Sequence, residues 1–177
     1  NENLCFDNVS YPEYEGPTGD GIVNVFDIIK LVGHILGTDP LGGYLLCAAD
    51  LTGEGIVNIN DIIQMVQLIL SDSPLGSDDA TEATIVNDGA SVSIIADGYV
   101  GGVDMIVEFD GEFNVTLNDK FIGDLLIKEN SAHIVLIGLN KESLNREYIE
   151  GTIFDYTGEI VSISQEMGNS RGMINNV

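Results

Sequence analysis

The fold of the first part of this chain is decided by the stretch Gly19-Asp20-Gly21-Ile22-Val23-Asn24-Val25-Phe26-Asp27-Ile28-Ile29-Lys30-Leu31-Val32. It recurs as Gly53-Glu54-Gly55-Ile56-Val57-Asn58-Ile59-Asn60-Asp61-Ile62-Ile63-Gln64-Met65-Val66. In both copies a glycine-containing segment with oxygen-bearing side chains leads into a run of apolar residues. Self-similarity of this kind indicates one structural unit that occurs twice.

Each copy predicts a helix that begins near its last aspartate, because the apolar residues that follow recur with helical spacing. In the first copy these are Ile28, Ile29, Val32, Ile35 and Leu36, and in the second they are Ile62, Ile63, Val66, Ile69 and Leu70. Gly37 and the Asp39-Pro40 pair are expected to end the first helix, and residues 71–76 the second.

The segment before each helix carries oxygen atoms at alternating positions around a glycine, which is the arrangement of an EF-hand calcium loop. In the second copy the predicted ligands are Asp50, Thr52, Glu54, the Ile56 carbonyl, Asn58 and Asp61. In the first copy they are Thr18, Asp20, the Ile22 carbonyl, Asn24 and Asp27. A hard cation needs about six to eight oxygen ligands. The pattern therefore predicts bound calcium, and the alternative is a glycine-rich turn capped by aspartate.

Two loop–helix copies of this kind, with aspartate at the last ligand position and no helix before the loop, resemble type I dockerins. The resemblance covers about residues 14–72. It implies two calcium ions, two antiparallel helices and a binding face that the helices form together. In cellulosomes this family docks onto cohesin modules.

The chain departs from the dockerin pattern at two places. Gly16 stands where the first loop would begin with aspartate, so the first site is expected to bind calcium more weakly. The recognition positions, which often read Ser-Thr in dockerins, are Val25-Phe26 and Ile59-Asn60. These residues predict a more apolar interface, or helices that pack against the rest of the same chain.

The second half of the chain predicts an antiparallel β-sandwich, because short alternating segments recur there with turn signals between them, among them Asp110-Gly111 and Thr157-Gly158. The expected strands are 83–87, 91–96, 102–109, 112–117, 122–128, 132–138, 148–155 and 159–165. The patterns at 102–110, 134–139 and 148–154 resemble a cohesin or a related carbohydrate-binding sandwich over about residues 83–166, and a generic sandwich is the alternative.

The predicted fold class is therefore α+β with two domains. The expected segments are an N-terminal tail at 1–15, a small all-α dockerin-like calcium-binding module at 16–72, a linker at 73–82, the sandwich at 83–166 and a C-terminal tail at 167–177.

The composition excludes some partners. The chain has 29 acidic and 6 basic residues and a formal net charge of −23, so it repels nucleic acid and anionic lipid surfaces. The sequence contains no run of about 18 apolar residues, so it predicts no membrane span. The acidity favours solubility, and it also supplies carboxylates that can act as cation ligands.

Several features favour an extracellular or cell-surface location. Cys5 and Cys47 are predicted to form a disulfide that ties the N-terminal tail to the repeat module, with buried free thiols as the alternative. Glycosylation sequons begin at Asn8 and Asn114. The first residue is Asn1 rather than Met, which fits a processed secreted chain.

The sequence does not favour an enzyme. It contains no nucleophile-elbow, zinc-protease or phosphate-loop motif. His34 and His133 have no recognisable partner constellation and are expected to be structural or exposed. The chain has no Trp for stacking on sugars, although six Tyr could substitute.

The sequence thus predicts a secreted, non-enzymatic protein that binds calcium and mediates protein–protein assembly. Its partner would be a cohesin-like domain or a neighbouring copy of the same chain. If the helical module and the sandwich are complementary, copies would join head to tail into a filament. The alternative is a cellulosome-type scaffold component or a carbohydrate-binding protein.

Overall fold

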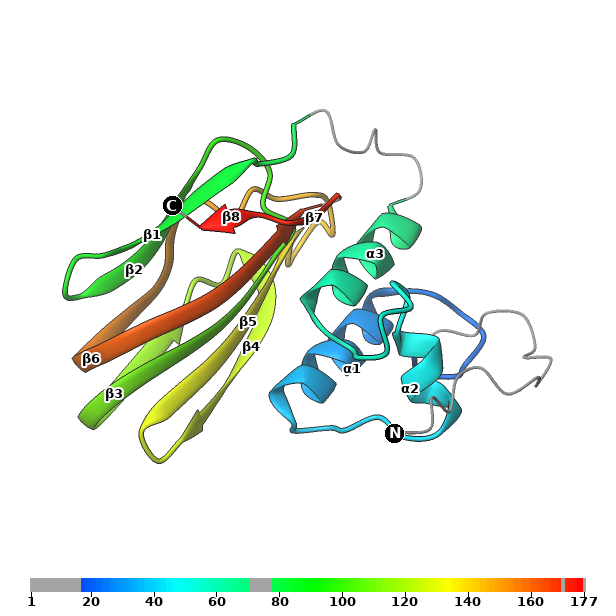
Figure 1. Ribbon diagram of the computed structural model, residues 1–177, viewed down its shortest axis with the longest axis horizontal. Coiled ribbons are helices and arrows are strands. Elements are labelled where there is room, and N and C mark those ends of the chain that lie inside the picture. Colours follow the sequence, from blue (N-terminus) through cyan, green and yellow to red (C-terminus); the bar gives the residue numbers. More distant parts are fainter. Residues whose placement is uncertain (1–16, 71–77, 170, 177) are drawn as a thin grey trace.

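The computed structural model describes residues 17–70, 78–169 and 171–176. The helices are α1 (Val25–Leu36), α2 (Tyr44–Ala49) and α3 (Ile59–Ile69). The strands are β1 (Glu82–Asn87), β2 (Ser91–Ala96), β3 (Gly102–Leu117), β4 (Phe121–Lys128), β5 (Ser131–Asn140), β6 (Gly151–Asn169), β7 (Gly172–Met173) and β8 (Asn175–Asn176). Figure 1 shows the helices together on one side of the sheet, with α1 and α3 nearest the strands.

The two predicted helices are confirmed as α1 and α3, and both begin in the same way. Asn24 and Asn58 are their N-caps, and each side chain accepts a hydrogen bond from a backbone N–H of the first turn. Asp27 and Asp61 complete capping boxes by accepting from the backbone N–H of the N-cap residue. Gly37 ends α1 in a left-handed conformation with φ of 76°, as its position predicted.

The sheet is antiparallel except for a short parallel contact between β1 and β8. Its strand order is β4-β5-β3-β6-β2-β1-β8, with β7 paired to β6. The first half of β3 lies between β5 and the end of β6, whereas the start of β6 lies between β2 and the second half of β3. The long strands β3 and β6 therefore extend through both parts of the sheet.

Two predicted turns are wrong, because Asp110-Gly111 and Thr157-Gly158 lie inside continuous strands. The pairing between β3 and β6 shifts register from Asp110 opposite Glu159 to Asn114 opposite Thr157. Gly111 and Gly158 have φ of 72° and 118°, so they allow an irregularity at which both strands can bend. Each pair of short strands predicted on either side of these glycines is therefore one long strand.

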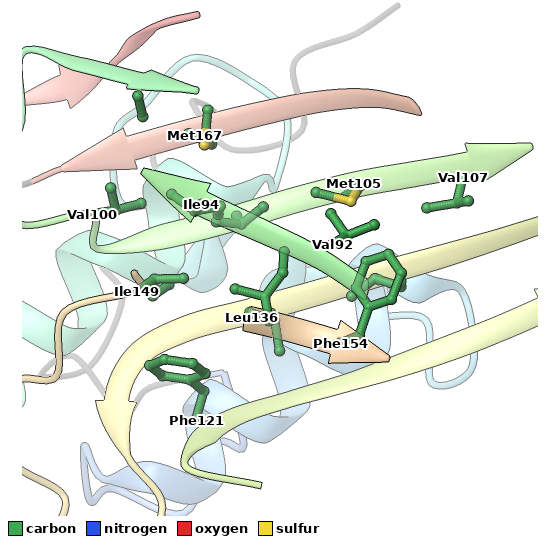
Figure 2. Packing of buried hydrophobic residues seen from close by; sticks show 14 of the residues in the cluster. Val92, Ile94, Val100, Met105, Val107, Phe121, Leu136, Ile149, Phe154 and Met167 are labelled. Atoms are coloured by element: carbon green, nitrogen blue, oxygen red, sulfur yellow. The ribbon is translucent and has the colours of Figure 1, made fainter. Parts of the chain in front are cut away.

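One hydrophobic cluster lies within the folded sheet. Figure 2 shows Val92 and Ile94 of β2 beside Met105 and Val107 of β3, with Phe154 of β6 near the start of β2. All of these side chains are almost fully buried. The antiparallel β-structure expected for the second half of the chain is thus confirmed.

The sheet continues beyond the residues assigned to it from the sequence. Strand β6 extends to Asn169, and β7 and β8 follow it, so residues 167–176 include strands. The predicted N-terminal tail, with Cys5 and Asn8, lies outside the described residues. So do Gly16 at the start of the first loop and residues 71–77 at the end of the second helix and in the linker. Among the helices described, none is long and apolar enough to cross a membrane.

A second hydrophobic cluster joins the helices to the sheet. It contains Ile28 and Leu31 of α1 and Ile62 of α3, and also Val135 and Ile137 of β5. The helices therefore share a core with the strands. The apolar recognition positions had predicted either an apolar interface with a partner or helices packed against the rest of the same chain. The second of these arrangements is present.

Helix α3 contacts the sheet at glycine residues. A Cβ atom added to Gly102 of β3 would lie 2.8 Å from Ile59, and one added to Gly168 of β6 would lie 2.7 Å from Ile63. Ile59 and Ile63 are buried. The absence of side chains at these glycines allows the helix to approach the strands closely.

The substitution Gly102→Ala is expected to destabilise the chain, because its methyl group would overlap the Cγ1 and Cδ1 atoms of Ile59, both 2.8 Å away. Overpacking of this kind costs about 1–3 kcal/mol in the free energy of unfolding, measurable by urea denaturation. Ile59→Val removes Cδ1, so the double variant should lose less than the sum of the two single variants. Unchanged stability of Gly102→Ala would contradict the close approach of α3.

Candidate metal centre

The second predicted loop gathers three carboxylates around one hydroxyl group. The Oγ1 atom of Thr52 lies 3.4 Å from Asp50 Oδ1, 3.1 Å from Glu54 Oε1 and 3.0 Å from Asp61 Oδ1. A threonine hydroxyl has a single proton and can donate to one of these acceptors at a time. Oxygen atoms crowded in this way fit a hard cation such as calcium.

Asp50 organises the turn of this loop. Its Oδ1 atom accepts hydrogen bonds from the N–H groups of Gly53 at 2.8 Å and Glu54 at 3.1 Å, and its Oδ2 atom accepts from Gly55 at 2.8 Å. Gly53 and Gly55 have φ of 73° and 90°, values that favour glycine. The leading aspartate therefore holds the loop in shape through these hydrogen bonds.

Asp27 and Asp61, the last predicted ligands of the two loops, are both fully buried. Each carboxylate accepts an N–H hydrogen bond from the N-cap asparagine of its helix and another from the threonine at the third position of its loop, at 2.8–3.0 Å. The same framework therefore occurs in both loops. It ties the start of each loop to the start of the helix that follows.

The first loop is less complete than the second. Asp20 accepts a hydrogen bond from the Ile22 N–H at 2.9 Å, and the Asn24 side chain donates to the Ile22 carbonyl at 3.3 Å. Thr18 contacts Asp27 through both its N–H and its hydroxyl group. The position equivalent to Asp50 is Gly16, which has no side chain to organise the turn.

The Asp61 carboxyl is electrostatically unusual. Burial is the main cause that raises its pKa above the ordinary aspartate value, and the negative charge of Asp50 raises it further. The hydrogen bonds from Asn58 and Thr52 act in the opposite direction. A bound cation would favour the ionised form of this carboxyl.

The predicted ligand set is mixed in chemistry, because threonine, asparagine and backbone oxygens accompany the carboxylates. Within the described ranges, no group of three or more His, Cys, Asp and Glu side chains is arranged to hold a metal ion. His34 instead has a structural contact, since its Nδ1 atom accepts a hydrogen bond from the Leu41 N–H at 2.9 Å. Burial lowers the pKa of His34.

Sequence reasoning missed a short side-chain hydrogen bond on the sheet. The Nε2 atom of His133 on β5 lies 2.6 Å from Oδ1 of Asp104 on β3, and both side chains are partly buried. The residues are 29 positions apart in sequence. Only the register of β3 with β5 brings them together, and no local motif could have revealed it.

Comparisons with known proteins add little to this picture. No family model matches the chain, and no curated protein matches it. Among solved structures, it has some similarity to a non-cellulosomal cohesin from the hyperthermophilic archaeon Archaeoglobus fulgidus. The TM-score is 0.41 and the identity 14%, over 54% of this chain and 85% of that chain. The residues of this chain, rather than a relative, therefore carry the assignment of function.

Lowering the pH is expected to weaken calcium binding at the second loop before ordinary aspartates titrate. The pKa of Asp61 is raised, so calcium must displace a proton from it as the pH falls through that value. Calorimetric titrations in two buffers of different ionisation enthalpy would report both the affinity and the released proton. An affinity that stays constant down to about pH 4, the ordinary aspartate range, would contradict this role of Asp61.

Without calcium, the same carboxyl should affect stability in the opposite sense from a salt-bridged aspartate. Because its folded pKa lies above the unfolded value, the native state binds the proton more tightly. The contribution of Asp61 to the free energy of unfolding therefore increases as the pH falls through the folded pKa. The control Asp61→Asn does not ionise, and its stability relative to wild type should fall over the same pH interval.

Proposed function

We propose that this chain is a non-enzymatic, calcium-binding protein that mediates protein–protein assembly. The observation that supports this proposal most is that the carboxylates of Asp50, Glu54 and Asp61 all lie close to the hydroxyl group of Thr52. With the Ile56 carbonyl and Asn58, these residues would supply the oxygen ligands of one calcium ion. Calcium would have a structural role here, because it would hold the segments of the loop together, and the proposal assigns it no catalytic role.

The two loops would bind calcium with different affinities. The second loop has a leading aspartate that already accepts three backbone hydrogen bonds. The first loop has Asp20 and Asp27 as its acidic ligands, and the number of charged ligands tunes calcium affinity. The second site is therefore the tighter one in this proposal.

Calcium binding would stabilise the sheet as well as the loops. Both candidate loops lead directly into helices that share a hydrophobic cluster with β4 and β5. Calcium ions that stabilise the first turns of α1 and α3 would therefore also stabilise the hydrophobic cluster that these helices share with the sheet. This coupling distinguishes the chain from a calcium module attached by a flexible linker.

The helical part would serve as a dockerin-like interaction module, but with only one of its two recognition pairs available. Ile59 is fully buried against the sheet and Asn60 is half-buried, whereas Phe26 is 66% exposed. A partner, whether a cohesin-like domain or a neighbouring copy, would therefore approach α1. If this surface meets a different surface of a neighbouring copy, the contact is head-to-tail and can produce a filament.

An extracellular location is part of the same proposal. Cys47 lies on α2, and its pairing with Cys5 stays a prediction because Cys5 is outside the described residues. The side chain of the sequon residue Asn114 is exposed on β3. An extracellular setting also provides the calcium concentration that weaker sites require.

Calcium is expected to raise the thermal unfolding midpoint of the whole chain in a single transition. At about 100 times the dissociation constant, one site adds about 2.7 kcal/mol to the free energy of unfolding. Asp50→Ala should remove the contribution of the second site. Near-UV and far-UV circular dichroism would follow tertiary structure and secondary structure in the same experiment.

The matched control is Asp119→Ala, which removes an exposed acidic residue outside both loops. It changes the net charge as Asp50→Ala does, so it should retain the calcium-dependent shift. A helical transition that responds to calcium while the sheet unfolds independently would contradict the coupling. The absence of any shift in the wild-type chain would contradict the proposed function.

A further inference from the structure

A groove of about 580 Å³ lies between α1 and strand β4. Phe26 and Ile29 of α1 form one side, Ile122 and Gly123 of β4 form the other, and Leu144 from the loop after β5 also lines it. Phe26, Ile29 and Leu144 are 66%, 53% and 39% exposed. Strand β4 pairs only with β5 in the described part of the sheet, so its other edge is open beside the groove.

Leu144 has an unfavourable backbone conformation at this groove. Its φ is 56°, the one positive φ among the described non-glycine residues. A leucine in the left-handed region is strained, and strained residues cluster at functional sites. The chain therefore keeps a costly conformation at the position where an apolar side chain lines the groove.

The charge of the groove differs from that of the chain as a whole. Its lining contains Lys30 and Lys141 together with Asp39 and Asp124, which balance, whereas the whole chain has a net charge of −23. Lys30 pairs with Asp39, while Lys141 has no ion pair among the described residues. At the groove, another acidic surface is therefore repelled less than the net charge of the whole chain would suggest.

We propose that this groove docks a second copy of this chain. Lys141 would face acidic side chains of the neighbour, and apolar side chains of the neighbour would cover Phe26, Ile29 and Leu144. If the grooves of two copies faced each other, Lys141 of one copy would repel Lys141 of the other. A contact between the groove of one copy and an acidic surface of the next is therefore favoured, and such a contact is head-to-tail. This inference rests on the proposed function and names the surface through which assembly occurs.

The groove also borders the first calcium loop. Thr18, a predicted ligand, lines it, and the Phe26 N–H donates to the predicted ligand Asn24 at 2.8 Å. An ion that orders this loop would hold Phe26 in place at the groove. Docking of the second copy is therefore expected to be stronger with calcium than with chelator.

The test is sedimentation velocity on the full chain over a concentration series, in low salt with calcium and with chelator. The wild-type chain should associate, and Lys141→Glu and Leu144→Asn should each weaken association at least about tenfold, which corresponds to about 1.4 kcal/mol. Lys128→Glu is the control, because it makes the same charge change on β4 outside this groove. It should change the dissociation constant by less than about twofold, as expected for a screened, distant charge.

Leu144→Asn separates docking from folding. Asparagine tolerates the left-handed region better than leucine does, so this variant should be at least as stable as the wild-type chain in urea denaturation. Weaker association with undiminished stability is the expected result, and a purely structural role for Leu144 does not predict it.

A wild-type chain that stays monomeric would overturn the proposal. So would association that Lys141→Glu and Lys128→Glu weaken equally, or that Leu144→Asn leaves unchanged. Calcium calorimetry on the same samples distinguishes the two levels of inference. Calcium binding without groove-dependent association overturns the docking surface alone, whereas the absence of calcium binding overturns the proposed function itself.

Discussion

The buried carboxylates of Asp27 and Asp61 are the interaction on which the first half of the structure depends. Each accepts hydrogen bonds from the N-cap asparagine and from a threonine nine residues earlier in the chain. A buried carboxylate is costly unless its oxygens are satisfied. These hydrogen bonds satisfy the carboxylate, and they also cap the helix and close the loop. In the second loop, the closed loop places carboxylate oxygens of Asp50 and Glu54 near the Thr52 hydroxyl group that Asp61 also contacts.

The shared core extends this local constraint to the rest of the chain. Helix α3 starts at the second loop and lies against Gly102 and Gly168, so its position depends on both the loop and the sheet. The same contact buries Ile59, one member of the second recognition pair. Two repeats that are nearly equal in sequence are therefore unequal in the fold, since Phe26 of the first repeat remains exposed.

Features that depend on local spacing could be predicted from the sequence. The repeat predicted both helices, and the alternation predicted most strands. Asp110-Gly111 and Thr157-Gly158 were misread as turns, because glycine favours a turn and an irregular strand position equally until the partner strand is known. The Asp104–His133 pair, the contact of Ile59 with Gly102 and the strained Leu144 depend on tertiary register, which single-sequence patterns do not encode.

Calorimetric titration of the full chain with calcium tests the central claim most directly, because it counts ions and ranks their affinities without reference to any partner. The account predicts two ions for each chain, with the tighter one lost in Asp50→Ala and the weaker one lost in Asp20→Ala. If neither loop binds calcium below millimolar concentrations, the loops are only capped turns and the account is wrong.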